Sequence, residues 1–303
     1  MSANKKQRRS TIYLSLLIAF FFLNAIHISD VGPEKNTHGT YNIKALKIPE
    51  NLTFAGEKVP TDRYDIRERM DRELLVNTYW QSNGLLMMKR ANKFFPVIEP
   101  LLKKYGIPDD FKYLAVAESG LQNNSSPAGA SGFWHFLRTS AREYGLEVNR
   151  NVDERYHLEL ATKVAAAYLK KSKERFGTWT LAAAAYNAGN ARIANRLKNQ
   201  QVDDYYDLLL NSETSRYVFR IVALKEIMSN PKKYGFEFDE EDLYSLPKTR
   251  TVEVDTAIVN IASFAKHFGT NYKALKLHNP WLRENNLNNK SRKLHHIKIP
   301  VDE

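Results

Sequence analysis

A single carboxyl group at the end of an apolar helical run carries the chemistry that this sequence suggests. Glu118 closes the run FKYLAVAE, which starts at Phe111. Residues three and four apart share one face of a helix, so Glu118 should lie beside Leu114 and Ala115 on the core side. Burial raises the pKa of a carboxyl group, and a carboxyl that keeps its proton near neutral pH can act as a general acid. Gly120 is expected to end the helix. The alternative is a solvated glutamate, as most glutamates at helix ends are.

Two later segments combine small residues with aromatic and polar side chains. Residues 125–136 contain two glycines, which let the backbone approach a ligand closely, and then an aromatic cluster that suits sugar rings. Residues 179–190 contain four consecutive alanines, a slim and strong helix former, ahead of Tyr186, Asn187 and a terminating Gly189. Taken alone, the first segment could equally be a tight loop whose aromatics fill the core. The second could be a packing helix with a polar end.

These segments occur in the order found in a known enzyme family. The chain resembles the catalytic domain of the soluble-type lytic transglycosylases, and more narrowly the membrane-bound lytic murein transglycosylase D group, over roughly residues 47–230. The matching motifs are Glu118-Ser119, residues 129–136 (GASGFWHF), Asp153-Glu154-Arg155 with the helix at 161–169, residues 185–189 (AYNAG) and residues 213–218 (ETSRYV). One such motif would be weak evidence, whereas five in order are specific.

The resemblance implies an enzyme that cleaves the β-1,4 bond between N-acetylmuramic acid and N-acetylglucosamine in peptidoglycan glycan strands. In this family the muramic acid 6-hydroxyl attacks its own anomeric carbon and leaves a 1,6-anhydro end, so no water is consumed. One acid/base carboxyl group suffices, in contrast to the pair that most glycosidases use. The resemblance implies no cofactor and no metal. Two alternatives stay open: a muramidase that hydrolyses the same bond, and a non-catalytic peptidoglycan-binding scaffold.

By position, the resemblance assigns roles to residues from several parts of the chain. Glu118 is the acid/base, and Ser119 and Ser126 are its polar neighbours. The others are expected to surround the carboxyl group: Trp134 and His135 line the glycan groove, Tyr186 and Asn187 face the carboxyl, and Glu213 and Tyr217 close the far side. A hydrogen bond from Tyr186 is expected to orient the carboxyl group.

Two residues depart from the family pattern. His135 stands where the family usually has Gln, and a neutral imidazole donates only one hydrogen bond. If protonated, His135 would place a positive charge near Glu118, lower the pKa of that carboxyl and oppose its role as an acid. His157 stands where the family often has Asp, at a position that we interpret as structural. Neither change removes the acid itself.

The N-terminus is typical of an exported protein. A basic stretch at residues 5–9 precedes an apolar run from Ile12 to Ile26, which has about the length of a signal sequence and is short for a membrane span. The segment is either a cleaved signal, which we favour, or an uncleaved anchor that associates with the membrane. The chain has no cysteine, which excludes disulfides, thiolate metal sites and a lipidated cysteine. We expect a periplasmic or cell-envelope location.

The charge of the chain fits an anionic partner but does not identify one. A net charge of +11 could meet nucleic acid, anionic lipids or anionic wall polymers, or could simply be a solvated basic surface. The export segment and the lack of any nucleic-acid-binding motif argue against nucleic acid. The eight histidines form no metal-binding pattern. The sequence gives no oligomeric state.

The chain is predicted to be mainly α, with a lysozyme-like helical catalytic domain and a small βααβ LysM-like module. The expected parts are residues 1–28 (signal peptide or anchor), 29–46 (linker), 47–235 (catalytic domain with an N-terminal helical extension), 236–248 (linker) and 249–303 (LysM-like module). Helices are expected within 62–105, where Pro96 and Pro100 interrupt the pattern, and at 157–174, 178–195 and 213–229.

The C-terminal part changes from helical to mixed patterning. Residues 251–254 alternate like a strand, a helix follows at 258–267, a second helix from Tyr272 is stopped by Pro280, and a last strand covers 294–300. This order resembles a LysM peptidoglycan-binding module, as do the pairs Asp255-Thr256, Ile261-Ala262 and Ile299-Pro300 and the run Asn279-Pro280-Trp281-Leu282. Val254 stands where such modules usually have Gly, so the module is predicted to be degenerate.

Overall fold

The structure is a computed structural model that describes residues 43–301. The apolar run at 12–26 and the predicted boundary at residue 28 lie outside the described residues. Within residues 43–301, no helix is both long and apolar enough to span a membrane. The described residues from 45 onward, 45–301, belong to one compact unit.

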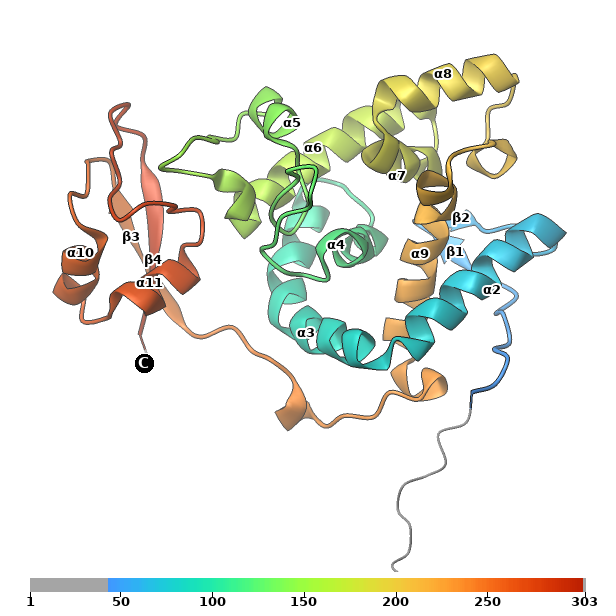
Figure 1. The fold of residues 1–303 in the computed structure, drawn as a ribbon, viewed down its shortest axis with the longest axis horizontal. Coiled ribbons are helices and arrows are strands. Elements are labelled where there is room, and N and C mark those ends of the chain that lie inside the picture. The colour runs from blue at the N-terminus through green and yellow to red at the C-terminus, as the bar shows by residue number, and fades with distance from the viewer. Residues whose placement is uncertain (1–42, 302–303) are drawn as a thin grey trace, which may run out of the picture. The chain divides into compact units, whose positions relative to one another are not determined.

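The first part of this unit is helical (Figure 1). Its α-helices are α2 (Tyr64–Tyr79), α3 (Gln81–Lys104), α4 (Lys112–Ser119), α5 (Arg138–Glu143), α6 (Leu158–Phe176), α7 (Trp179–Ala188), α8 (Asn190–Gln200) and α9 (Ser212–Ser229). Short 3-10 turns cover Asp109–Phe111, Glu154–Tyr156, Tyr205–Asp207, Pro231–Tyr234 and Glu240–Asp242. A short hairpin precedes the helices, in which β1 (Thr53–Phe54) pairs antiparallel with β2 (Glu57–Lys58). The predicted mainly α architecture is confirmed.

Helix α4 is the centre of the helical part, and it packs against both α3 and α9 (Figure 1). Its residues Leu114 and Ala115 are fully buried, and α9 buries a broad apolar face. Helix α7 packs between α6 and α9, and its four consecutive alanines, residues 182–185, are fully buried. Because alanine side chains are small, these helices approach α7 closely, as the alanine run predicted.

Two stretches of the helical part differ from the prediction. The helix expected at 178–195 is broken at Gly189, whose φ of 89° and ψ of 140° lie outside the helical region, so α7 and α8 are separate. Pro96 and Pro100 do not interrupt α3, which continues through both. Each proline removes one backbone hydrogen bond, yet Ile98 and Leu102 between and beyond them are fully buried and keep the helix packed on the core.

Two carboxylates, of Glu57 and Glu73, join elements that are distant in the sequence. Glu57 of β2 accepts hydrogen bonds from the backbone N–H groups of Trp179 (2.7 Å) and Thr180 (2.8 Å), so it caps the N-terminus of α7. Glu73 of α2 is 1% exposed and accepts a hydrogen bond from Arg216 of α9 at 2.7 Å. These contacts hold α7 and α9 in place. Helix α9 packs directly against α4, and α7 packs against α9.

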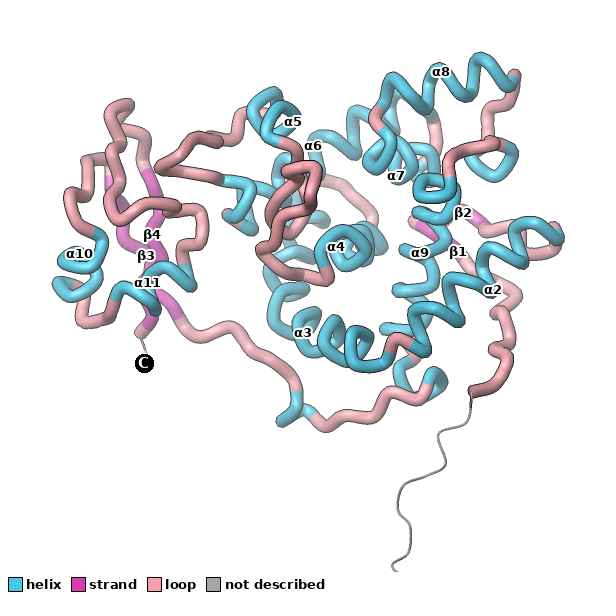
Figure 2. Tube along the Cα trace, in the orientation of Figure 1, coloured by secondary structure: helices cyan, strands magenta, loops and turns pink. Residues whose placement is uncertain are grey.

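The C-terminal module, residues 249–301, has the predicted βααβ order (Figure 2). Strand β3 (Thr249–Val254) pairs antiparallel with β4 (His295–Pro300), and α10 (Ile261–His267) and α11 (Tyr272–His278) lie between them in the chain. Helix α10 begins three residues later than predicted, because the Asn260 side chain caps it and Ile258 pairs instead with Leu287. The module has its own apolar core, which includes Ile261, Leu275, Leu282, Leu287, Ile297 and Ile299.

The module is docked on the helical part through residues 148–156. The side chain of Asn151 is buried and donates to the carbonyl and the side-chain oxygen of Asn286, at 2.9 and 2.7 Å. It also accepts from the N–H of Asn288 at 2.9 Å, and its carbonyl accepts from the N–H of Arg283. Val152 packs into the module core. The side chain of Asn151 therefore satisfies two backbone groups of the module, the Asn286 carbonyl and the Asn288 N–H.

We predict that Asn151→Ala loosens the module. The substitution removes three part-buried hydrogen bonds to Asn286 and Asn288, each worth about 0.5–1.5 kcal/mol, so the free energy of unfolding should fall by about 1–3 kcal/mol. Limited proteolysis should cut faster between residues 236 and 248. The matched control is Arg150→Ala, because Arg150 is 92% exposed and only forms a surface ion pair with Glu284; its effect should stay within about 0.5 kcal/mol. Equal effects of the two substitutions would contradict the proposed docking role.

Candidate active site

Glu118 lies in the last turn of α4, with its side chain 15% exposed. Gly120 follows in the left-handed conformation (φ 59°) and ends the helix, as predicted. Burial raises the pKa of the Glu118 carboxyl to about 7, against the lowering effects of the Tyr217 hydroxyl and the Arg220 charge, while the charge of Glu213 raises the pKa further. A carboxyl group with this pKa is partly protonated at neutral pH and can both give and accept a proton.

The hydrogen-bond partner of Glu118 is Tyr217 of α9. The Tyr217 side chain is buried, and its hydroxyl donates to Glu118 Oε1 in a short hydrogen bond. Burial and the nearby Glu118 charge raise the pKa of Tyr217 well above its usual value, so the phenol keeps its proton and remains a donor. The donor therefore stabilises the carboxylate form that follows proton release.

The sequence-based assignment of this hydrogen bond to Tyr186 was wrong. The Tyr186 hydroxyl donates instead to the backbone carbonyl of Trp134 at 2.7 Å. Tyr186 still lies close enough for the Glu118 charge to raise its pKa, although burial is the larger cause. Tyr186 thus ties α7 to the loop at 123–136 and does not bind the carboxyl group.

His135 faces the other oxygen of Glu118. Its Nδ1 lies 3.7 Å from Glu118 Oε2, and its Nε2 is hydrogen-bonded to Asn124 Oδ1 at 2.7 Å. Because an amide oxygen only accepts, Nε2 carries the hydrogen and the neutral ring presents its Nδ1 lone pair to Glu118. Burial lowers the pKa of His135, so the ring is neutral at neutral pH. The positive charge considered in the sequence analysis is therefore absent there, and it does not oppose protonation of Glu118.

His135 also adopts an uncommon backbone conformation. Its φ is 48°, in the left-handed region that non-glycine residues seldom occupy. Such strain persists only where the surroundings impose it, and it is frequent at functional sites. Here the backbone N–H of His135 donates to Gly132 O at 3.2 Å, which closes a tight turn and aims the ring at Glu118.

Trp134 does not line a groove, contrary to the sequence-based expectation. Its side chain is fully buried, and its indole N–H donates to Thr162 of α6 at 2.9 Å. Its ring also packs edge-on against Tyr186. An aromatic ring that stacks on a sugar must be exposed, and the Trp134 ring is not. Trp134 is therefore part of the core that supports the site.

The two predicted serines contact the backbone. Ser119 is buried and donates to the carbonyl of Phe133 at 2.8 Å, which joins the end of α4 to the aromatic cluster. Ser126 accepts from the N–H of Ala130 at 3.1 Å within its own turn. Both hydroxyl groups therefore shape the loop around Glu118.

Asn187 and Glu213 lie together at the ends of α7 and α9. Asn187 donates to Glu213 Oε1 at 3.2 Å and accepts from the Thr214 hydroxyl at 2.9 Å. Glu213 acts on Glu118 through its charge, which raises the pKa of the carboxyl. Of the predicted side chains, Tyr217 and His135 are thus the two that lie next to the Glu118 oxygens.

Three arginines hold the surroundings of Glu118, and the sequence singled out none of them as a site residue, although Arg155 belongs to the Asp153-Glu154-Arg155 motif. Arg155 is buried, forms an ion pair with Asp153, and donates to the carbonyls of Gly129 (2.9 Å) and Phe136 (3.0 Å). It thereby clamps the loop that carries His135. Arg220 lowers the pKa of Glu118, and Arg90 of α3 donates to Gly120 O at 3.2 Å. The Asp153-Glu154-Arg155 motif marked the clamp, but nothing local showed which carbonyl groups it binds.

Gly132 shows how closely the clamp fits. Its φ is 80°, and an added Cβ would lie 2.0 Å from the carbonyl oxygen of Arg155. Only glycine allows this contact between two backbone segments.

Within residues 43–301, no group of three His, Cys, Asp or Glu side chains could hold a metal ion. The arrangement thus offers proton transfer by one shielded carboxyl group, with a phenol donor on one oxygen and a neutral imidazole near the other.

Comparison with known proteins gives two domain matches. Residues 96–209 match the Transglycosylase SLT domain, and residues 250–303 match the Soluble lytic transglycosylase C-terminal LysM-like domain. The chain is 31% identical over 183 residues to membrane-bound lytic murein transglycosylase D from two strains of Escherichia coli. The match covers 58% of this chain and 40% of each relative.

A search of solved structures found the lytic transglycosylase Slt of Pseudomonas aeruginosa, as an inactive mutant. It shares 20% identity with a TM-score of 0.39, over 50% of this chain and 26% of that chain. The sequence matches decide the assignment: the chain carries an SLT transglycosylase domain followed by a LysM-like domain of the soluble lytic transglycosylases, and it is a distant homologue of membrane-bound lytic murein transglycosylase D.

Proposed function

We propose that this protein is a peptidoglycan lytic transglycosylase that uses Glu118 as its acid/base. It cleaves the β-1,4 bond between N-acetylmuramic acid and N-acetylglucosamine and forms a 1,6-anhydromuramic acid end. The observation that supports this most is the shielded Glu118 carboxyl, whose pKa burial raises to about 7. Such a group is poised for proton transfer in either direction near neutral pH.

The reaction needs one proton to leave Glu118 and another to return. The protonated carboxyl gives its proton to the glycosidic oxygen as the bond to the anomeric carbon breaks, and N-acetylglucosamine departs. The carboxylate then takes a proton from the muramic acid 6-hydroxyl while that oxygen bonds to the anomeric carbon. Glu118 ends protonated. No water is consumed, because the 6-hydroxyl is the nucleophile in place of water. Tyr217 stabilises the intermediate carboxylate through its hydrogen bond to Oε1.

The domains support a place for this reaction in the cell envelope. SLT and LysM-like domains imply binding to peptidoglycan, which is found there. The homologues are named membrane-bound, but the N-terminal apolar run of this chain lies outside the described residues. Hydrolysis of the same bond and wall binding without cleavage are the competing functions, and the products separate all three.

Product analysis tests the reaction and its acid together. Digestion of murein should yield fragments lighter than hydrolytic products by the mass of one water, as measured by mass spectrometry. Glu118→Gln keeps the size of the side chain but removes the proton, so the rate should fall by at least about 100-fold. The matched control is Glu174→Gln on the exposed part of α6, which should leave the rate unchanged. Reducing ends would instead indicate a muramidase, and an active Glu118→Gln variant would exclude Glu118 as the acid.

The pH profile tests the hydrogen bond from Tyr217. Activity requires protonated Glu118, so the rate should decline as pH rises through about 7, the pKa of that carboxyl. The Tyr217 hydroxyl lowers this pKa, so Tyr217→Phe should raise it and move the alkaline decline to higher pH. Tyr186→Phe removes a hydroxyl of the same kind that binds Trp134 instead, so its alkaline decline should stay near that of the unmodified protein. A decline that moves to lower pH in Tyr217→Phe would contradict the assignment.

A further inference from the structure

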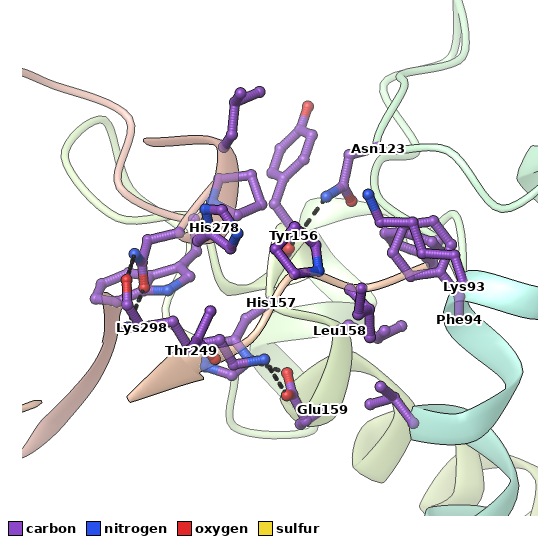
Figure 3. Close-up of a pocket in the computed structure, with 18 residues that line it drawn as sticks. Lys93, Phe94, Asn123, Tyr156, His157, Leu158, Glu159, Thr249, His278 and Lys298 are labelled. Atoms are coloured by element: carbon purple, nitrogen blue, oxygen red, sulfur yellow. Dashed lines mark hydrogen bonds and ion pairs between the residues drawn. The ribbon is translucent and has the colours of Figure 1, made fainter. Parts of the chain in front are cut away.

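A cavity of about 310 Å³ lies between the helical part and the C-terminal module (Figure 3). Helix α3 contributes Lys93 and Phe94 on one side, and His278 at the end of α11 lies across from them. The start of α6 forms the wall between the two sides. The proposed reaction at Glu118 uses none of these side chains.

The walls of the cavity are held in place by contacts between the two parts. The N–H of Asp153 donates to the carbonyl of Trp281 at 2.9 Å, and the Lys298 ammonium pairs with Glu159. The buried Asn151 network secures the same segment. A cavity fixed in this way is largely preformed, which lowers the cost of ordering it when a ligand binds.

One positive charge in the cavity is left without a carboxylate. Glu159 is occupied by Lys298 and lies 3.2 Å from His157 Nδ1; burial raises its pKa, but these neighbours outweigh burial and lower it to about 2. Glu159 is thus ionised and already paired. Lys93, by contrast, has no carboxylate within ion-pair distance among residues 43–301, and its ammonium lies 5.5 Å from the centre of the Phe94 ring.

The rest of the lining is apolar and aromatic. Tyr156 and Trp281 are largely buried, and Phe94 and Pro280 add apolar surface. The cavity therefore matches a ligand with an aliphatic portion and a negatively charged group. A neutral oligosaccharide would supply no counter-charge to Lys93, whereas a peptide with free carboxylates would.

The cavity adjoins the loop that carries His135. Asn123 and Phe133 line it, while the neighbouring Asn124 binds the His135 ring that faces Glu118. The Phe133 carbonyl accepts from Ser119, the residue after Glu118. The loop at 123–136 thus borders both the cavity and the surroundings of Glu118.

We propose that this cavity binds the acidic stem peptide of the peptidoglycan strand whose muramic acid lies at Glu118. A stem carboxylate pairs with Lys93, and the aliphatic stem portion packs on Phe94 and Tyr156. The proposal rests on the proposed function and specifies the substrate further: a glycan strand that still carries its peptides. The docked module thereby completes a subsite that the helical part alone would lack.

Direct binding tests the cavity independently of catalysis. The full chain would be titrated with a synthetic stem tripeptide (Ala-γ-Glu-diaminopimelate) by isothermal titration calorimetry. Lys93→Met keeps the aliphatic chain and removes the charge, so affinity should fall about tenfold or more, as expected for one charge-assisted hydrogen bond. Lys103→Met on an exposed turn of the same helix is the matched control and should bind as the unmodified protein does. Absence of binding, or equal affinities for Lys93→Met and the control, would overturn the proposal.

Cleavage assays separate this proposal from the proposed function. On murein with stem peptides, Lys93→Met should raise KM several-fold with kcat unchanged, and on glycan strands stripped of peptides it should match the unmodified protein. Glu118→Gln should lose activity on both substrates yet still bind the tripeptide. Peptide binding that depends on Lys93 without any glycan cleavage would refute only the proposed function. Cleavage kinetics that change neither with Lys93→Met nor with removal of the stem peptides would refute only the proposed role of the cavity.

Discussion

The site depends on the balance of two opposing effects on one carboxyl group. Burial at the end of α4 destabilises the charged form of Glu118, while the Tyr217 hydroxyl stabilises it. With more donors the group would be an ordinary carboxylate, and with none it would hold its proton too firmly to release it. Burial is the larger effect and leaves the pKa at about 7, where donating and recovering a proton are both feasible.

This balance requires that α4 and α9 hold the Glu118 carboxyl and the Tyr217 hydroxyl within hydrogen-bond distance of each other. The structure meets this requirement with buried anchors away from the carboxyl itself. Glu73 holds α9 through Arg216, and the alanine face of α7 lets α9 pack closely. Arg155 clamps the loop that places His135 opposite the second oxygen, and the same segment carries the C-terminal module. The module is thus joined to the part of the chain that shapes the site.

Local pattern predicted most of the elements, but not how they meet. Periodicity placed Glu118 on a buried helix face, and Gly120 marked the helix end, because both depend on neighbouring residues. The βααβ module followed from alternation and helix signals in the same way. Tyr217 was assigned to the site, but its bond to Glu118 was given to Tyr186, since a contact across 99 residues depends on packing. Burial of Trp134 was missed for the same reason.

The central claim is that the Glu118 carboxyl holds its proton near neutral pH. The most direct test is a titration of the full chain labelled with ¹³C at glutamate side-chain carboxyl carbons, followed by NMR, with Glu118→Gln used to assign the signal. We predict a midpoint at about 7 for the signal that the substitution removes. A midpoint near 4.5, the ordinary value for glutamate, would contradict the claim.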